Sequence, residues 1–114
     1  LAFKPNTDDM RDAPSLDIIP ALIDDGASIR AHDPEAMEEA KKHFGDTITY
    51  CRGPYEALEG ADVLLIITEW DEYRALDLER AGKILSEKVI VDLRNVYPPA
   101  DMQAKGWRYS SIGR

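Results

Sequence analysis

The chain has 114 residues, of which 44% are hydrophobic and 32% charged, a balance typical of one folded globular domain. Its formal net charge of −8 argues against general nucleic-acid binding, which needs a basic surface to displace counterions. No apolar run is long enough to span a membrane, and the apolar start is too short for a signal peptide. The single cysteine, Cys51, excludes an internal disulfide and favours a reducing, cytoplasmic location.

The first fourteen residues join a short apolar stretch to a highly charged loop. Residues 1–3 predict the end of a buried strand, and the proline after Lys4 favours an extended backbone where the chain leaves the sheet. Arg11 follows, just before Asp12 and Pro14, which predict the N-cap and first turn of a helix. Two cations and a helix N-terminus at a strand-to-helix turn are typical of sites for anionic or phosphorylated ligands.

Strand and helix patterns alternate along the rest of the chain. Apolar spacing predicts a helix over residues 16–25 that contains Pro20, and a second up to residue 44 with Asp33 as its N-cap. The apolar run 63–67 lacks alternation and predicts a strand buried on both faces. Residues 71–85 predict one helix, weakened at Gly82. Further strands are predicted at residues 28–33, 47–51, 89–93 and 107–113, and a short helix at 54–60.

This order predicts an α/β fold, a doubly wound and mostly parallel sheet of about six strands with helices on both faces, close in plan to half of a Rossmann fold. Such sheets bind ligands beyond the carboxyl ends of their strands. Cations and aromatic rings predicted at those ends are Phe3, Lys4, Arg52, Trp70 and Arg94. They suit a diphosphate and an apolar ring face. The alternative is that the arginines form ordinary surface ion pairs with nearby carboxylates.

Residues that suggest a metal or a nucleophile have simpler explanations. Cys51 predicts a packed thiol, and His32 and His43 are isolated in the sequence, so we expect no metal site. The adjacent Asp8 and Asp9 leave open a different class of protein, a stand-alone acidic α/β binding or signalling module that responds to Mg²⁺. No GxGxxG follows a predicted strand, so the chain lacks a dinucleotide-binding fingerprint of its own.

The stretch LAFKPNTDDMRDAPSL, with DVLLIITEW and VIVDLRNVY further along, resembles the C-terminal UDP-binding domain of the UDP-glucose/GDP-mannose dehydrogenase family. The resemblance spans essentially all of residues 1–114. It implies that NAD-binding and central domains precede this chain, an expectation that the apolar start also favours. It further implies that the whole protein oxidises UDP-glucose to UDP-glucuronate with two NAD, UDP-N-acetylmannosamine or GDP-mannose being the alternative substrates.

The resemblance also implies roles for individual residues. Lys4 matches a lysine that contacts the UDP-sugar, with Phe3 beside it as a backbone or packing contact. Arg11 matches an arginine that reaches NAD held mainly by the upstream domain. Arg94 matches a position near the substrate. The family's cysteine nucleophile lies upstream, so we expect no catalytic residue in this chain and no activity from it alone. As partners we expect the upstream domains and further copies of the whole protein.

Overall fold

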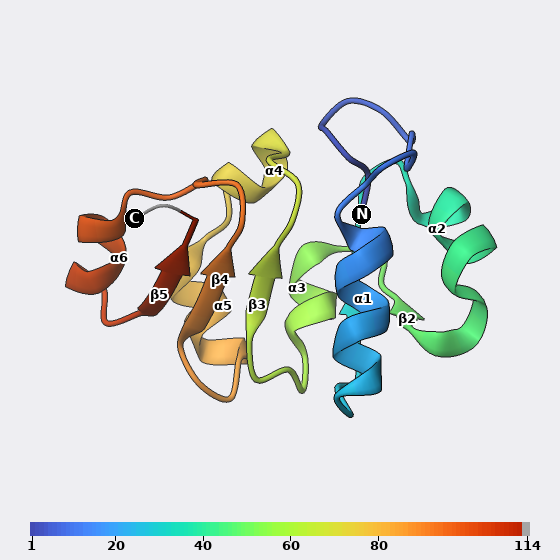
Figure 1. Cartoon of the computed structure of the whole chain (residues 1–114). Helices are drawn as coiled ribbons and strands as arrows, with labels where there is room; N and C mark the ends of the chain where they lie inside the picture. Colours follow the sequence, from blue (N-terminus) through green and yellow to red (C-terminus); the bar gives the residue numbers. More distant parts are fainter. Residues whose placement is uncertain (113–114) are drawn as a thin grey trace. The chain divides into compact units, whose positions relative to one another are not determined.

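The computed structural model describes residues 1–112, which fold as two compact units (Figure 1). Unit 1 runs from Leu1 to Ala57, and unit 2 begins at Leu58. The parallel strands and alternating helices confirm the α/β class. Five strands, rather than about six, form within the described residues, two in unit 1 and three in unit 2. No helix of the described part is both long and apolar enough to cross a membrane.

Unit 1 packs helices against a short parallel pair of strands. Its helices are α1 (Ser15–Asp24), α2 (Met37–Phe44), the 3-10 turn η1 (Gly45–Thr47) and α3 (Pro54–Leu58), which ends at the unit boundary. Its strands are β1 (Arg30–Ala31) and β2 (Thr49–Tyr50), with Arg30 opposite Thr49. The buried apolar side chains of the unit include Met10, Ile19, Ala40, Phe44 and Ile48. Helical spacing of apolar residues therefore predicted the core-facing sides of α1 and α2.

Helix α1 forms as predicted in its middle and differs at its start. It continues through the exposed Pro20 to Asp24, and Gly26 follows with a φ of 92°, the left-handed conformation common after a helix. The prediction of Asp12 as N-cap is wrong, because Asp12 has a φ of 57° and the helix begins at Ser15. The buried Ser15 instead donates its hydroxyl to the carbonyl oxygen of Leu1 at 2.7 Å.

The predicted strand at residues 1–3 is wrong as a hydrogen-bonded strand, although Leu1 and Ala2 are buried as expected. The amino group of Leu1 and the N–H of Ala2 donate to a side chain, the carboxylate of Asp33. Asp33 also accepts the backbone N–H groups of Glu35 and Ala36 and so caps the turn at residues 34–36. The prediction of Asp33 as the N-cap of the second helix is wrong, because α2 begins only after that turn and its N-cap is Ala36.

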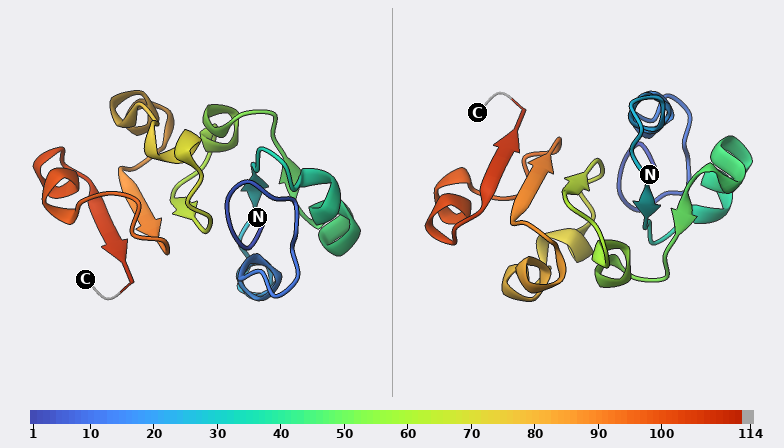
Figure 2. Two further views of the ribbon diagram at one scale, coloured as in Figure 1. Left: turned by 90° about the horizontal axis from the view of Figure 1, so that it is seen from above. Right: turned by 90° about the horizontal axis from the view of Figure 1, so that it is seen from below.

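Unit 2 is built on a three-stranded parallel sheet in the order β3-β4-β5. The strands are β3 (Leu64–Ile66), β4 (Val89–Asp92) and β5 (Arg108–Ser111), and the helices are α4 (Asp71–Arg74), α5 (Leu78–Ile84) and α6 (Pro99–Ala104). Figure 2 shows the three strands side by side, with α5 over one face and α6 beside β5. Ile90 in the central strand is fully buried. The register places Asp92 opposite Ile66 on one side and Ser111 on the other.

Three details of unit 2 differ from the sequence predictions. The helix predicted over residues 71–85 is divided into α4 and α5, and the break is at Asp77, whose side chain accepts the N–H of Arg80 and caps α5. Gly82 lies inside α5, where a Cβ would come within 2.7 Å of Cε of Lys88. Val63 is 46% exposed, so the apolar run is not buried on both faces at its start. The predicted last strand reached Gly113, which lies outside the described residues.

Candidate functional site

Residues 3–11 of unit 1 form a closed loop, called here the Lys4 loop. The N–H of Phe3 donates to the carbonyl oxygen of Asp9 at 3.2 Å, and the N–H of Asp9 donates to Oγ1 of Thr7 at 3.1 Å. Asn6 lies at the turn with a φ of 65°, a conformation that asparagine tolerates better than most residues. Buried residues stand at both ends of the loop, Ala2 before it and Met10 within its last turn. The loop is thus anchored in the core while its polar side chains face outwards.

Phe3 and Lys4 contact each other within this loop. The ammonium nitrogen of Lys4 lies 5.3 Å from the centroid of the Phe3 ring, within the range of a cation–π interaction. Phe3 is half-buried against the core of unit 1, whereas Lys4 is exposed. The ring therefore restrains the ammonium while leaving it open to an anionic ligand. The proposed contacts of Phe3 and Lys4 with a UDP-sugar stay predictions.

Arg11 ends the loop and is oriented by Asp9. Its Nη2 lies 2.7 Å from Oδ2 of Asp9, its Nε lies 3.1 Å from both carboxylate oxygens, and its backbone N–H donates to Oδ1 at 2.9 Å. These hydrogen bonds hold the pKa of the Asp9 carboxyl below its usual value and raise the pKa of the Arg11 guanidinium. The Arg11 side chain is 88% exposed. The surface ion pair considered as an alternative does form, and it presents the guanidinium in a fixed direction.

An open hollow of about 400 Å³ lies beside this ion pair in unit 1. Its lining residues are Thr7, Asp8, Asp9, Met10, Arg11, Glu39 and His43. Asp8, Asp9 and Glu39 contribute acidic side chains to this lining, and Arg11 contributes a guanidinium. Within residues 1–112 no three His, Cys, Asp or Glu side chains are grouped so as to hold a metal ion. The predicted packing of Cys51 is confirmed, since it is a buried thiol with 1% exposure.

Asp33 fixes the backbone from which the Lys4 loop departs. Its side chain is buried, and Oδ2 accepts from the nitrogen atoms of Leu1 and Ala2 at 2.8 and 3.0 Å. Oδ1 accepts from the N–H groups of Glu35 and Ala36 at 2.9 and 2.8 Å. A carboxylate suits this position because it accepts hydrogen bonds at both oxygens and needs no donor. The sequence predicted Asp33 only as a helix cap.

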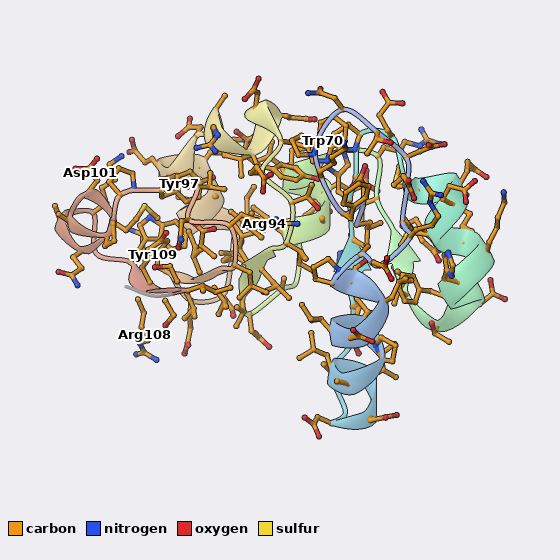
Figure 3. The ribbon with its side chains drawn as sticks, turned by 45° about the horizontal axis from the view of Figure 1, so that its top comes forward. Trp70, Arg94, Tyr97, Asp101, Arg108 and Tyr109 are labelled. Atoms are coloured by element: carbon orange, nitrogen blue, oxygen red, sulfur yellow. The ribbon has the colours of Figure 1, made fainter. Side chains whose placement is uncertain are left out.

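Arg94, the remaining predicted site residue, belongs to unit 2 and follows β4. Its Nε donates to the carbonyl oxygen of Ile67 at 2.7 Å and lies 3.4 Å from Oε2 of Glu69. The guanidinium is thus held against the carboxyl end of β3, and the Arg94 side chain remains 28% exposed. Figure 3 labels Arg94, which lies in the turn that follows β4. Trp70 is 7% exposed, so burial leaves little of its ring for stacking on a ligand.

The turn after β4 is organised by a second buried carboxylate, Asp92. Its Oδ1 accepts the N–H of Arg94 at 3.0 Å, and its Oδ2 accepts the N–H groups of Val96 and Tyr97 at 2.7 and 3.1 Å. Tyr109 of β5 directs its hydroxyl at the same oxygen, 2.6 Å away. Neither Asp92 nor Tyr109 was predicted as a site residue. The available signal was an aspartate directly after a buried apolar strand.

Comparison with known proteins identifies the family of the chain. Residues 1–99 match the sequence model described as UDP-glucose/GDP-mannose dehydrogenase family, UDP binding domain. The chain is 49% identical over 114 residues to a UDP-glucose 6-dehydrogenase of Rhizobium meliloti and 46% identical to UDP-glucose 6-dehydrogenase TuaD of Bacillus subtilis. Each match covers 100% of this chain and 26% or 25% of the relative. The chain therefore spans about a quarter of the length of these relatives.

Solved structures agree with the sequence comparison. A UDP-glucose dehydrogenase from Pyrobaculum islandicum matches with a TM-score of 0.78 and 36% identity, over 96% of this chain and 23% of that one. An NDP-N-acetyl-D-galactosaminuronic acid dehydrogenase from Methanosarcina mazei matches with a TM-score of 0.83 and 29% identity, over 99% of this chain and 23% of that one. The chain therefore belongs to the UDP-glucose/GDP-mannose dehydrogenase family and corresponds to its UDP binding domain.

Proposed function

We propose that this chain is the C-terminal, nucleotide-sugar-binding domain of a UDP-glucose 6-dehydrogenase. The observation that carries the proposal is its identity of 49% and 46%, over the full 114 residues, to two proteins of that name. NAD-binding and central domains are proposed to precede residue 1 in the whole protein, which acts as a homo-oligomer in the cytoplasm. The isolated chain is proposed to be inactive, because the nucleophile and most NAD contacts belong to the upstream domains.

In the proposed reaction the C6 alcohol of UDP-glucose becomes the carboxylate of UDP-glucuronate. Two hydrides leave the carbon in successive steps, NAD accepts them, and water supplies the second oxygen. This chain contributes binding and orientation rather than bond breaking. Lys4 offers an exposed ammonium over the Phe3 ring, which suits an oxygen of the sugar nucleotide. Arg94 of unit 2, held at the carboxyl end of β3, is proposed separately as a substrate contact on the basis of the resemblance.

Arg11 is the residue proposed to contact NAD. Its guanidinium is exposed and oriented by Asp9, so the planar donors suit a phosphate or ribose oxygen of a cofactor that enters from outside the chain. The acidic side chains around it make the neighbouring hollow a poor site for a bare anion. Arg11 is therefore proposed as one contact of a composite site, in which the upstream domain supplies the remainder.

The test is NAD reduction by the full-length protein with UDP-glucose, UDP-N-acetylmannosamine or GDP-mannose. The proposal expects two NADH for each UDP-glucose consumed, and none from the 114-residue chain alone. UDP-N-acetylmannosamine is the second candidate, because a dehydrogenase of that sugar from Pyrococcus horikoshii matches the whole chain with a TM-score of 0.76 and 28% identity. Reduction with that substrate and not with UDP-glucose would contradict the first proposal and support the second.

A further inference from the structure

Asp92 accepts four hydrogen bonds among the described residues of unit 2, and all four stabilise the turn that follows β4. Three of the donors are the backbone N–H groups of Arg94, Val96 and Tyr97, and the fourth is the hydroxyl of Tyr109. The Asp92 carboxylate has no exposed surface. Asn95, within the turn, has a φ of 54°, a left-handed conformation that asparagine adopts more readily than most residues. The turn after β4 is therefore wrapped around a single carboxylate.

Tyr109 links this carboxylate to the neighbouring strand. It lies on β5, opposite Ile90 of β4, and its hydroxyl oxygen is 2.6 Å from Oδ2 of Asp92 and 2.9 Å from the carbonyl oxygen of Tyr97. In Figure 3 Tyr109 and Tyr97 lie near each other and to one side of Arg94. The hydroxyl thus fixes the far side of the turn that carries Arg94. A phenylalanine at this position would keep the ring packing and remove only this restraint.

We infer that Asp92 and Tyr109 are positioning residues, which hold the backbone of Arg94 so that its guanidinium is presented in one direction to the UDP-sugar. The inference rests on the proposed function, because it assumes that Arg94 contacts the substrate. Two independent restraints act on Arg94. Asp92 fixes its backbone N–H, and Ile67 together with Glu69 fixes its Nε. A residue held at both ends loses little freedom on binding, so the restraints favour affinity.

The two carboxylate oxygens of Asp92 accept different numbers of hydrogen bonds, so one substitution can remove the bond to Arg94 and keep the others. Among residues 1–112, Oδ2 accepts from Val96, Tyr97 and Tyr109, whereas Oδ1 accepts only from Arg94. In Asp92→Asn we expect the amide oxygen to take the place of Oδ2, which accepts three hydrogen bonds. The NH₂ group then takes the place of Oδ1 and faces the N–H of Arg94. The variant removes the restraint on Arg94 and retains the other three bonds. Tyr109→Phe tests the same turn from the other strand.

The experiment measures steady-state kinetics of the full-length protein with UDP-glucose and NAD. Asp92→Asn and Tyr109→Phe are each expected to raise KM for UDP-glucose about 3- to 10-fold, the scale of one hydrogen bond, while kcat and KM for NAD change less than about twofold. Ser86→Ala is the matched control, since it also removes a hydroxyl that donates to an aspartate, Asp62, at 2.7 Å. That pair precedes β3 and β4, at the opposite ends of the strands, and KM is expected to stay unchanged.

A double-mutant cycle with Arg94→Ala separates positioning from general stabilisation. If Tyr109 acts through Arg94, Tyr109→Phe has no further effect on KM for UDP-glucose once Arg94 is alanine. An equal effect in both backgrounds, or a wild-type KM in Arg94→Ala, overturns the inference. If instead the proposed function is wrong, the wild-type protein will fail to oxidise UDP-glucose, a result that differs from both of these outcomes. Thermal unfolding of each variant confirms that the folded protein is the species compared.

Discussion

The guanidinium of Arg11 and the carboxylate of Asp9 form an ion pair with several hydrogen bonds on the surface of unit 1, with 2.7 Å between Nη2 and Oδ2. The same carboxylate accepts the backbone N–H of Arg11, so the pair closes the last turn of the Lys4 loop. Exposed ion pairs contribute little to stability. The importance of this pair therefore lies in the direction it gives to a cation proposed to meet NAD.

The protonation of Asp9 provides a first test of this pair. Hydrogen bonds from Arg11 lower the pKa of Asp9 from its ordinary value of 3.8. The folded state thus has the lower pKa, so the pair stabilises the loop above the ordinary value, and that contribution is lost as pH falls through the folded pKa. In an NMR titration of the Asp9 carboxyl carbon we expect a midpoint below 3.8 and a return towards 3.8 in Arg11→Ala. The same midpoint in both proteins would show that the pair does not persist in solution.

The buried carboxylate of Asp33 predicts a stability effect. In Asp33→Asn the amide NH₂ must face two donors whichever way it turns, either the amino group of Leu1 and the N–H of Ala2 or the N–H groups of Glu35 and Ala36. Leaving such donors without an acceptor costs about 1–3 kcal/mol of unfolding free energy. Urea unfolding measures the change.

Asp62→Asn is the control for Asp33→Asn. Asp62 is exposed and accepts one hydroxyl from Ser86, which an amide oxygen still accepts. Its free energy of unfolding is expected to change by less than about 0.5 kcal/mol. Equal losses in the two variants would contradict the role given to Asp33 in holding the start of the Lys4 loop.

The core of unit 2 gives a third prediction. Ile90 lies in the central strand β4 with no exposed surface, so Ile90→Ala leaves a cavity and is expected to cost about 2–5 kcal/mol of unfolding free energy. Val63→Ala removes apolar atoms from a side chain that is 46% exposed and is expected to cost less than about 1 kcal/mol. Denaturant unfolding monitored by tryptophan fluorescence distinguishes the two. Similar costs would mean that Val63 is covered in solution.

Sequence reasoning succeeded where a local pattern determines the structure. The alternation of helices and strands predicted the α/β class, and the run VIVD corresponds to β4. It failed where a distant partner decides the local structure. Leu1 and Ala2 are buried without forming a strand, and the N–H of Ala2 donates to the side chain of Asp33, more than thirty residues away. The capping bond at Asp77, which divides the predicted helix, is local and was overlooked.

In the candidate site, Lys4, Arg11 and Arg94 were selected because charged residues near predicted strand ends are visible in the sequence. The family resemblance supplied their roles, which stay predictions. Asp92 and Tyr109 were missed because their role depends on which N–H and O–H groups converge on one carboxylate. That convergence is set by the pairing of β4 with β5, a property of the folded chain.

In the full-length protein, Lys4 is proposed to contact UDP-glucose and Arg11 to contact NAD. Lys4 stands at the start of the loop over the Phe3 ring, and Arg11 stands at its end beside Asp9. Lys4→Ala is expected to raise KM for UDP-glucose by about 10- to 100-fold, as loss of a hydrogen bond to a charged group does, with a smaller change for NAD. Arg11→Ala is expected to do the reverse, and Arg11→Lys to recover little because an ammonium lacks the planar donor geometry.

Steady-state kinetics of Lys4→Ala and Arg11→Ala, with each substrate varied at saturating levels of the other, distinguish the two roles. We expect Lys4→Ala to raise KM for UDP-glucose and Arg11→Ala to raise KM for NAD. Equal changes in both constants for both variants would contradict this expectation, and would mean that the two residues only maintain the shape of the loop.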